Sequence, residues 1–393
     1  MKELQQIVNA YKEAVSYGFK AALATVVQVE GSAYRHEGAR MLIREDGQLT
    51  GAISGGCLEG DALRKALLAM SKNQNMLVTY DTTDDDDAKL GVGLGCNGII
   101  QVLIEPIDSS ASANPINLFK RFLSKRQKAV IGTFFSFQDR QAEQPGTCML
   151  LQSDEAFVSE YEDQTLKNEF ESDARRIVKS GSSIVKEYGT GQKMLGFLEL
   201  LRPPVSMLIF GAGNDAIPLV QFASILGWEA KIIDGRPNYA SPSRFPLAQQ
   251  VRIAKSENVL EDIIIDDRTV AVLMTHNYNY DLSVLRQLLN VNIRYIGTLG
   301  PKKKLQRMLD ELGEEGLAIP EEKLQIIFGP TGLDIGSQTP EEIALSIISE
   351  INAVLTNRDG RSLRLKPAGS NISPGSNSGH QYKSKFASCP ISL

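Results

Sequence analysis

Residues 206–216 read SMLIFGAGNDA, and residues 229–234 read EAKIID. The first stretch is an apolar, strand-like run that ends in Gly211 and Gly213, and a helical pattern follows it. Gly211 permits the tight turn from strand to helix, and Gly213 lets the backbone approach a phosphate at the helix N-terminus. Asp234, at the end of the second run, stands where an acid accepts a hydrogen bond from a ribose hydroxyl. This order of strand, turn, helix, strand and acid predicts a Rossmann-like fold.

The same segment does not determine which ligand, if any, the domain binds. A fold does not carry a function by itself, so the glycine turn also fits a structural sheet that binds nothing. If the turn binds a nucleotide or a phosphate, Gly211, Gly213 and Asp234 are the expected contacts. Arg236 follows the acid and leaves NAD, NADP and a mononucleotide as alternatives.

The domain organisation follows from the pattern on either side. Strand and helix patterns alternate up to about residue 355, which is typical of a parallel sheet flanked by helices. Arg202-Pro203-Pro204 ends the preceding pattern, because neither proline offers a ladder donor. We therefore expect an α/β protein with an N-terminal α+β domain, built on a mixed sheet, and a Rossmann-like doubly wound parallel sheet. The expected bounds are 1–202, 203–357 and, for a flexible tail rich in Ser, Gly, Asn and Pro, 358–393.

Within the N-terminal domain, local signals predict a strand, a hairpin and a helix. Residues 20–29 form an apolar, β-rich run. The pair Asp46-Gly47 predicts a tight two-residue turn, because both residues tolerate positive φ. A helical pattern then runs from Leu58 to Met70.

Two of the four cysteines stand among glycines. Cys57 follows Gly55 and Gly56 and directly precedes the predicted helix, whose dipole would favour a thiolate. Cys96 lies in the stretch GVGLGCNG, which is suited to wrapping backbone N–H groups around an anion or a planar ligand. The alternative is that each cysteine is a small buried hydrophobic residue. Their shared setting favours a chemical role.

Other polar residues follow the later strands of the Rossmann-like domain. His276 follows the strand-like run VAVLM, and the carboxyl ends of parallel strands are where such sheets bind ligands. A helix-cap partner or a surface polar residue is the alternative for this histidine. Lys302, Lys303 and Lys304 fit either an anion site or a solvated helix start. Residues 339–342 read TPEE and predict a capped helix start, whereas capping does not explain the preceding GLDIG at 332–336.

Composition narrows the class of protein. The formal net charge of −5 gives no general field for attracting nucleic acid or an anionic membrane. No run approaches the ~18 apolar residues of a membrane span, and the first residues lack a signal-peptide pattern. We therefore expect a cytoplasmic protein with no nucleic-acid or membrane partner. With three histidines and no CxxC pair, we expect no metal site.

Taken together, the motifs resemble the xanthine dehydrogenase accessory protein family, the XdhC/CoxI-like family. They occur in family order across roughly residues 20–356. The matching stretches are GSAYRHEGARMLI, GAISGGCLEGD, GVGLGCNGIIQVLIEP, LIFGAGNDA, MTHNYNYD, YIGTLG and GPTGLDIGSQTPEEIALSI.

The resemblance implies an accessory factor or chaperone more than a stand-alone enzyme. Its members are implicated in binding the molybdenum cofactor (molybdopterin), supporting its sulfuration with a cysteine desulfurase, and delivering it to a molybdenum hydroxylase apo-enzyme of the xanthine dehydrogenase type. The resemblance also implies a homodimer. The thiols of Cys57 and Cys96 would then handle the cofactor. The expected cofactor contacts in the N-terminal domain are Arg35, Arg40, Gly55, Gly56, Gly93 and Gly95.

A second function from another class stays open. A free-standing NAD(P)-dependent oxidoreductase would use the Rossmann-like domain for its nucleotide and His276 as a catalytic acid or base. Co-purified pterin and molybdenum would favour the first function, and turnover of a nicotinamide nucleotide would favour the second.

Overall fold

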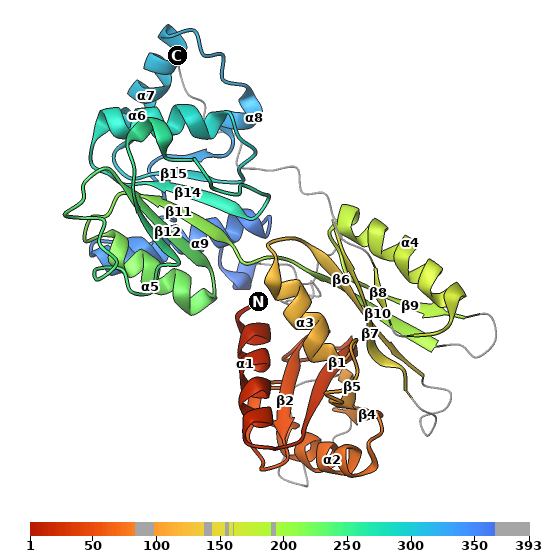
Figure 1. Cartoon of the computed structure of the whole chain (residues 1–393). Helices are drawn as coiled ribbons and strands as arrows, with labels where there is room; N and C mark the ends of the chain where they lie inside the picture. The colour runs from red at the N-terminus through yellow and green to blue at the C-terminus, as the bar shows by residue number, and fades with distance from the viewer. Residues whose placement is uncertain (83–97, 137–143, 154–156, 160, 190–193, 366–393) are drawn as a thin grey trace. The chain divides into compact units, whose positions relative to one another are not determined.

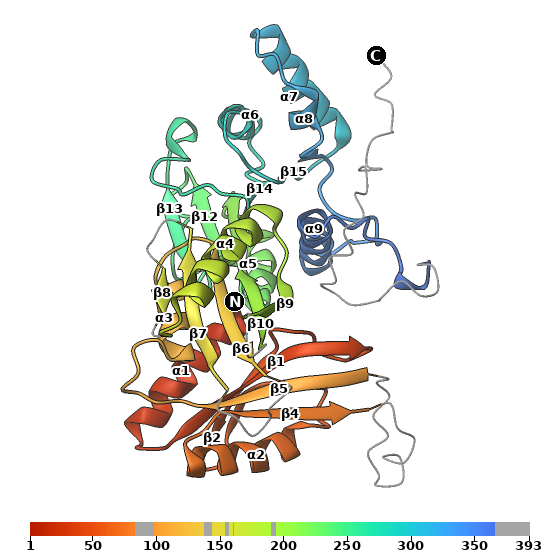
Figure 2. The same cartoon turned by 90° about the vertical axis from the view of Figure 1, so that its right-hand side faces the viewer.

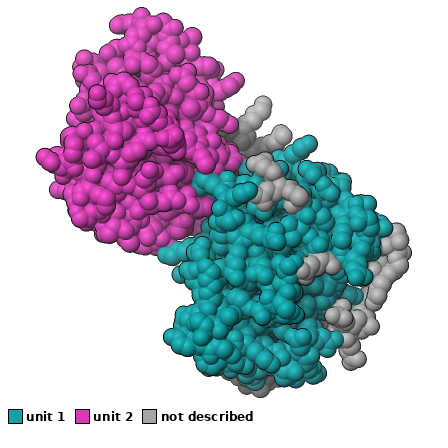
Figure 3. Space-filling model, in the orientation of Figure 1, with its two compact units in different colours: residues 1–203, 371–378 teal, residues 204–370, 379–393 magenta. Residues whose placement is uncertain are grey.

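The computed structural model describes residues 1–82, 98–136, 144–153, 157–159, 161–189 and 194–365 (Figure 1). The predicted site residues Gly93, Gly95 and Cys96 lie outside these ranges. The chain divides into two compact units between Pro203 and Pro204, coloured separately in Figure 3.

Unit 2 is built on a six-stranded sheet in the order β13-β12-β11-β14-β15-β16. All of its pairings are parallel. Numbered from β11 as the first strand, the order is 3-2-1-4-5-6, as in a Rossmann fold. The strands are β11 (Ser206–Phe210), β12 (Glu229–Asp234), β13 (Gln250–Ile253), β14 (Thr269–Leu273), β15 (Ile296–Thr298) and β16 (Ile327–Phe328). The predicted Rossmann-like sheet is confirmed.

Helices cover both faces of this sheet (Figure 1). Alternate residues of a strand point to opposite faces, so Met207 packs with α5 and α9, whereas Leu208 packs with α6 and α7. The longer helices are α5 (Ala216–Leu226), α6 (Tyr278–Leu289), α7 (Lys302–Glu314) and α9 (Pro340–Leu355). A short helix, α8 (Glu321–Leu324), and two 3₁₀ turns, η2 (Ser256–Asn258) and η3 (Leu363–Leu365), complete the unit's described elements.

Unit 1 contains two five-stranded sheets, with orders β3-β2-β1-β5-β4 and β8-β7-β6-β10-β9. The first comprises β1 (Ala21–Gly31), β2 (Arg40–Arg44), β3 (Leu49–Gly51), β4 (Met76–Asp81) and β5 (Gly98–Pro106). The second comprises β6 (Ala129–Phe135), β7 (Gly146–Gln152), β8 (Val158–Ser159), β9 (Ile184–Tyr188) and β10 (Met194–Leu201). The helices are α1 (Lys2–Ser16), α2 (Glu59–Lys72), α3 (Pro115–Ser124) and α4 (Gln164–Ser180).

The α+β class of the N-terminal part is confirmed, but the expected mixed sheet is not found among the described strands. Every pairing that they make in unit 1 is antiparallel. The physical reason is the connections: strands such as β2 and β3 follow each other too closely for the crossover that a parallel pair needs.

The hairpin between β2 and β3 also differs from its prediction. Its turn closes through a hydrogen bond from the N–H of Gly47 to the carbonyl of Arg44, 3.0 Å long. Gly47 has a φ of +90°, but Asp46 does not adopt positive φ. Instead, the Asp46 carboxylate accepts a 2.7 Å hydrogen bond from the Arg44 guanidinium. A wider turn with a single left-handed glycine therefore replaces the two-residue turn.

The cores of unit 1 explain how its sheets are covered. Helix α2 packs on one face of the first sheet, and α1 and α3 pack on its other face together with residues of the second sheet. Helix α4 covers the second sheet. Glu105 of β5 joins the sheets, because its buried carboxylate accepts hydrogen bonds from the N–H and the hydroxyl of Thr147 on β7, at 2.6 and 2.9 Å. Burial raises the pKa of Glu105 to about 7, although Thr147 and Arg40 oppose the shift.

Candidate functional site

The glycine turn of unit 2 joins β11 to α5. Gly211 has a φ of +123°, and a side-chain carbon there would lie 2.6 Å from the carbonyl carbon of Met274, so only glycine fits. Its N–H donates to the carbonyl of Ile233 at 2.9 Å. A side-chain carbon on Gly213 would instead meet nothing within 4 Å. The first glycine is therefore required by the fold, and the second borders open space.

Asp234 lies next to this turn and is fully engaged. Its Oδ2 accepts from the N–H of Ala212 at 2.8 Å and from Nη2 of Arg236 at 2.7 Å, and its Oδ1 accepts from the N–H and Nε of Arg236, both at 2.9 Å. Burial alone would raise the pKa of this carboxyl, but the hydrogen bonds from Arg236 and Ala212 outweigh it and lower the pKa. The acid thus holds an arginine in place.

Arg244 is a further residue of this region, and sequence reasoning missed it. Its Nη1 donates to the carbonyls of Ala212 and Tyr239, at 2.6 and 2.7 Å, and its Nη2 donates to the side chain of Asn214 at 2.9 Å. The guanidinium carbons of Arg236 and Arg244 lie 4.2 and 5.5 Å from the ring centroid of Tyr239. No local signal marks Arg244, because its partners in the glycine turn are some 30 residues away along the chain.

His276 lies just beyond β14 and faces the start of α5. Its Nε2 hydrogen-bonds to the carboxylate of Asp215 at 3.0 Å, and the imidazole is 62% exposed. The residue adopts a φ of +58°, which is unusual for a non-glycine residue and is often found at functional sites. It is not the helix cap, since Asn277 caps α6 by accepting from the N–H of Tyr280. Asp215 follows β11 and His276 follows β14. These neighbouring strands lead to helices α5 and α6 on opposite faces of the sheet, which is where such sheets bind ligands.

Two other sequence features of unit 2 have structural roles. Lys304 donates from its Nζ to the buried Asp281 at 2.6 Å and to the carbonyl of Leu299 at 3.1 Å, so it is not free to bind an anion. The Gly332 N–H donates to the Glu350 carboxylate at 2.9 Å, and the Ser346 hydroxyl donates to the carbonyl of Leu333 at 2.6 Å. Side chains of α9 thus hold the 332–336 loop, which the sequence left unexplained.

In unit 1, the Cys57 loop, residues 52–58, leads from β3 to α2. Cys57 is exposed and precedes Leu58, the N-cap residue, so the helix begins one residue later than predicted. Gly56 has a φ of +111° with no neighbour within 4 Å of a would-be side-chain carbon. The Tyr34 ring lies against Gly55, with its Cγ 3.5 Å from the corresponding position. The thiol and the backbone around it are open to the surface.

Glu59 holds this loop, and sequence reasoning missed it. Its carboxylate accepts from the N–H of Ser54 at 2.9 Å, from the N–H of Leu58 at 3.1 Å and from the Ser54 hydroxyl. The Ser54 hydroxyl in turn accepts from the N–H groups of Gly56 and Leu58 at 3.2 and 3.1 Å. Burial would raise the pKa of Glu59, but the hydrogen bonds from Ser54 outweigh it and lower the pKa. Glu59 and Ser54 therefore fix the loop from its buried side, while Cys57 is exposed.

The two predicted arginine contacts differ in exposure. Arg35 donates from its Nη2 to the carboxylate of Glu3 at 2.6 Å and is about one third exposed. Arg40 is buried, with a side chain only 1% exposed, and it pairs with Glu199 at 2.5 Å above the ring of Phe119. This environment corrects the prediction for Arg40, because an interior guanidinium already paired with a carboxylate is not available to a surface-bound cofactor.

Strand ends link the Cys57 loop to the segment that contains Cys96. The hydroxyl of Tyr80, on β4, donates to Asp61 in the first turn of α2 at 3.1 Å. Thr82, two residues further on, exchanges hydrogen bonds with Gly98, at 3.1 Å from the Gly98 N–H and 2.6 Å to its carbonyl. Strands β4 and β5 run side by side above α2 (Figure 2). The described ends of segment 83–97 are thus clamped beside the helix that follows Cys57.

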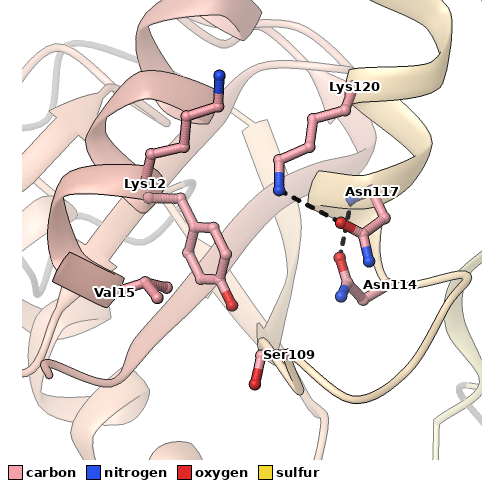
Figure 4. A pocket seen from close by; sticks show the side chains of 7 residues that line it. Lys12, Val15, Ser109, Asn114, Asn117 and Lys120 are labelled. Carbon is pink, nitrogen blue, oxygen red and sulfur yellow. Dashed lines mark hydrogen bonds between the residues drawn. The ribbon is translucent and has the colours of Figure 1, made fainter.

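A cavity of about 240 Å³ lies elsewhere in unit 1, between α1 and α3 (Figure 4). Asn114 caps α3 by accepting from the N–H of Asn117, and its amide nitrogen donates to the carbonyls of Asp108 and Ala111. Lys120 donates to Asn117 at 3.4 Å. The polar lining of this cavity therefore mainly orders the start of α3. Its lining residues are Tyr11, Lys12, Val15, Ser109, Asn114, Asn117 and Lys120.

The two sites define a class: a protein that joins a Rossmann unit to an antiparallel α+β unit with a displayed cysteine loop. Residues 207–351 match the XdhC Rossmann domain, and residues 15–81 match the XdhC and CoxI family. The chain belongs to the XdhC and CoxI family. In the described residues no helix is long and apolar enough to cross a membrane, and no group of three or more His, Cys, Asp or Glu is placed to hold a metal ion.

Named relatives match nearly the whole chain. It is 32% identical over 332 residues to a probable xanthine dehydrogenase subunit of Bacillus subtilis (strain 168), covering 84% of this chain and 92% of that protein. It is 25% identical over 342 residues to the molybdenum cofactor insertion chaperone PaoD of Escherichia coli (strain K12), covering 87% and 86%. A crystal structure of a xanthine dehydrogenase from Bacillus halodurans superposes with a TM-score of 0.73 at 28% identity, covering 92% and 98%.

Proposed function

We propose that this protein is a molybdenum cofactor chaperone that supports sulfuration of the cofactor and its insertion into a molybdenum hydroxylase of the xanthine dehydrogenase type. The observation that carries the proposal is the Cys57 loop, with its exposed thiol held from behind by Glu59. The names of its relatives, a molybdenum cofactor insertion chaperone among them, support the insertion part of this function.

The chemistry of the loop fits this cargo. The cofactor combines a phosphate, a planar polar pterin and a soft metal centre. The exposed thiol of Cys57 suits a soft metal, and the ring of Tyr34 offers a surface for stacking. The N–H of Gly56 is bonded to Ser54, so the uncovered carbonyl of Gly56 is the group that suits a hydrogen bond from the pterin. Arg35 supplies a partly exposed cation at the same connection between β1 and β2.

Cys96 belongs to the same proposed site. It stands two residues before Gly98, which is bonded to Thr82 at the end of β4, and Tyr80 ties β4 to the first turn of α2. This chain of contacts favours one site that includes both cysteines, with Gly93 and Gly95 as backbone donors.

Transfer of sulfur to this protein, which precedes sulfuration of the cofactor, uses a thiol as the acceptor. A Cys57 thiolate attacks the outer sulfur of a persulfide on a cysteine desulfurase, a new S–S bond forms, and the desulfurase thiolate leaves. The exchange needs no outside oxidant or reductant, because one S–S bond is made and one is broken. An exposed thiol is required for such an encounter between two proteins.

Activation of a client enzyme tests the proposal. Full-length protein purified from cells that make the cofactor is incubated with an apo molybdenum hydroxylase, and hydroxylase activity is followed. The parent protein should activate the enzyme, and Cys57→Ala should reduce activation to about a tenth or less. Equal activation with and without the protein would exclude the chaperone function. Light scattering of the same sample measures whether the protein is the expected homodimer.

Unit 2 is proposed to bind a nucleotide at its glycine turn. Gly213 borders open space, and the N-terminus of α5 turns the positive end of its helix dipole toward a phosphate there. Gly211 shapes the turn, and Asp234 acts by holding Arg236.

The oxidoreductase alternative rests on one observation, the pairing of His276 with Asp215 at the edge of this turn. An exposed histidine oriented by a carboxylate can act as an acid or base. Turnover of a nicotinamide nucleotide with small carbonyl or hydroxyl compounds, abolished by His276→Asn, would favour this function.

A further inference from the structure

The end of β12 lacks the free acceptor that an unmodified ribose needs. Asp234 receives four hydrogen bonds, three from Arg236 and one from the N–H of Ala212. An ionised carboxylate has about four acceptor positions, so this one is saturated. The ribose hydroxyls of a nucleotide such as NAD, which donate to an acid at this position, would have to displace Arg236.

The same place offers oriented hydrogen-bond donors. Arg236 uses Nε and Nη2 on Asp234, its Nη1 donates to no described residue, and its side chain is 46% exposed. Its guanidinium carbon lies 4.2 Å from the centroid of the Tyr239 ring. The ion pair and the ring fix the plane of the guanidinium, which leaves the free N–H groups facing outward.

A second cation stands on the same ring. Arg244 is fixed by the carbonyls of Ala212 and Tyr239 and by the side chain of Asn214, and its guanidinium carbon lies 5.5 Å from the Tyr239 centroid. Its bond to Ala212 places it beside the glycine turn, where the rest of a nucleotide would pass. Of the two carboxylates near the turn, Asp234 pairs with Arg236 and Asp215 hydrogen-bonds to His276, so Arg244 is a cation with no carboxylate of its own among the described residues.

We propose that unit 2 selects a nucleotide whose ribose carries a phosphate, as in NADP, over one with an unmodified ribose, as in NAD. A phosphate presents acceptors only, and the end of β12 presents donors only. Arg236 is the specificity-determining residue, Asp234 and Tyr239 position it, and Arg244 adds a second positive charge. This inference rests on the proposed nucleotide site at the glycine turn.

Calorimetric titration of the full-length protein tests the selection, at about 0.15 M salt so that unspecific attraction is screened. NADP⁺ should bind at least about tenfold more tightly than NAD⁺, and 2′,5′-ADP at least about tenfold more tightly than 5′-ADP, because a charge-assisted hydrogen bond distinguishes the members of each pair. Equal affinity within both pairs would overturn the selection and leave the nucleotide site in place. No binding of any of the four would overturn the site itself.

Variants assign the effect to Arg236. Arg236→Gln should lose about tenfold or more in affinity for NADP⁺ and none for NAD⁺, whereas Arg236→Lys, which keeps the charge but not the planar fork, should fall between. Arg361→Gln removes one positive charge from an exposed residue of the same unit and should bind like the parent. A thermal melt confirms that each variant is folded. Parent-like selectivity in folded Arg236→Gln and Arg236→Lys would overturn the assignment.

Discussion

The two glycine turns of this protein look alike in sequence and differ in what requires the glycine. At Gly211 the backbone of Met274 occupies the space of a side chain, so the turn is a packing requirement of the sheet. At Gly56 the surroundings are empty, and order comes from Glu59 and Ser54 behind the loop. Beside the first turn, the carboxylate of Asp234 is hydrogen-bonded within the protein, whereas in the second loop the thiol of Cys57 is exposed.

The difference shows that a glycine motif does not by itself distinguish a structural turn from a reactive one. The side chains behind the turn decide. The carboxylate of Asp234 accepts hydrogen bonds from Arg236. The carboxylate of Glu59 accepts hydrogen bonds from the loop backbone, and Cys57 makes no hydrogen bond to the described residues. Each turn can therefore be broken separately, and the losses should differ in kind.

The largest effect is expected at the first turn. Gly211→Ala places a side-chain carbon against Met274 at a φ that favours glycine, and should destabilise unit 2 by about 4 kcal/mol. The single tryptophan of the chain, Trp228, packs against the core of unit 2, so its fluorescence during urea denaturation reports this unit. Gly213→Ala, with open space and no positive φ, is the matched control and should change stability by less than about 0.5 kcal/mol. Equal losses in both variants would contradict the packing argument.

The second-largest effect is a pH dependence of stability that differs between the two units. Burial raises the pKa of Glu105 to about 7 from the ordinary 4.5, so folded unit 1 keeps a proton that the unfolded chain has released. Stability should then fall as pH rises from about 4.5 to about 7, by about 3 kcal/mol. Glu105→Gln should remove this fall, measured by far-ultraviolet circular dichroism in urea at about pH 5 and about pH 8.

Asp234 should give the opposite response in unit 2. Its pKa is lowered, so its contribution is present above pH 3.8 and is lost as pH falls through the lower folded value. Between about pH 5 and about pH 8 it contributes no change, and the tryptophan transition serves as the internal control. An unchanged pH slope in Glu105→Gln would show that Glu105 is not the titrating group.

A smaller effect is expected in the Cys57 loop. Glu59→Gln keeps the shape of the side chain but loses acceptor capacity toward Ser54 and Leu58, which should weaken the loop by about 1 kcal/mol. Hydrogen exchange of a peptide covering residues 52–60 should become faster. Asp61→Asn removes a charge from the same first turn of α2 but makes no hydrogen bond to the loop, so its exchange there should match the parent. Faster exchange in both variants would point to the helix dipole instead.

Sequence alone predicted much of the fold, because the Rossmann segment is a continuous local pattern from Ser206 to Asp234. It did not predict the roles of Arg244 and Glu350, whose partners are 32 and 18 residues away, since such contacts leave no periodic signal. It also placed Arg40 at the surface site, although the residue is buried against Glu199, 159 positions further on. The contact between Glu59 and Ser54 could have been predicted, because the two residues are only five positions apart. Glu59 was instead interpreted only as part of the helical pattern.

Cys57 is proposed to hold the cofactor, and the molybdenum and pterin content of the purified protein measures this binding. Cys57→Ser should retain about tenfold less of both than the parent, because a hydroxyl is a poor ligand for a soft metal. Cys148→Ser is the matched control: this thiol packs in the core of the second sheet of unit 1, where burial, aided by Glu105, raises its pKa. Cys148→Ser should contain as much molybdenum and pterin as the parent, whereas parent-like content in Cys57→Ser would contradict cofactor binding by Cys57.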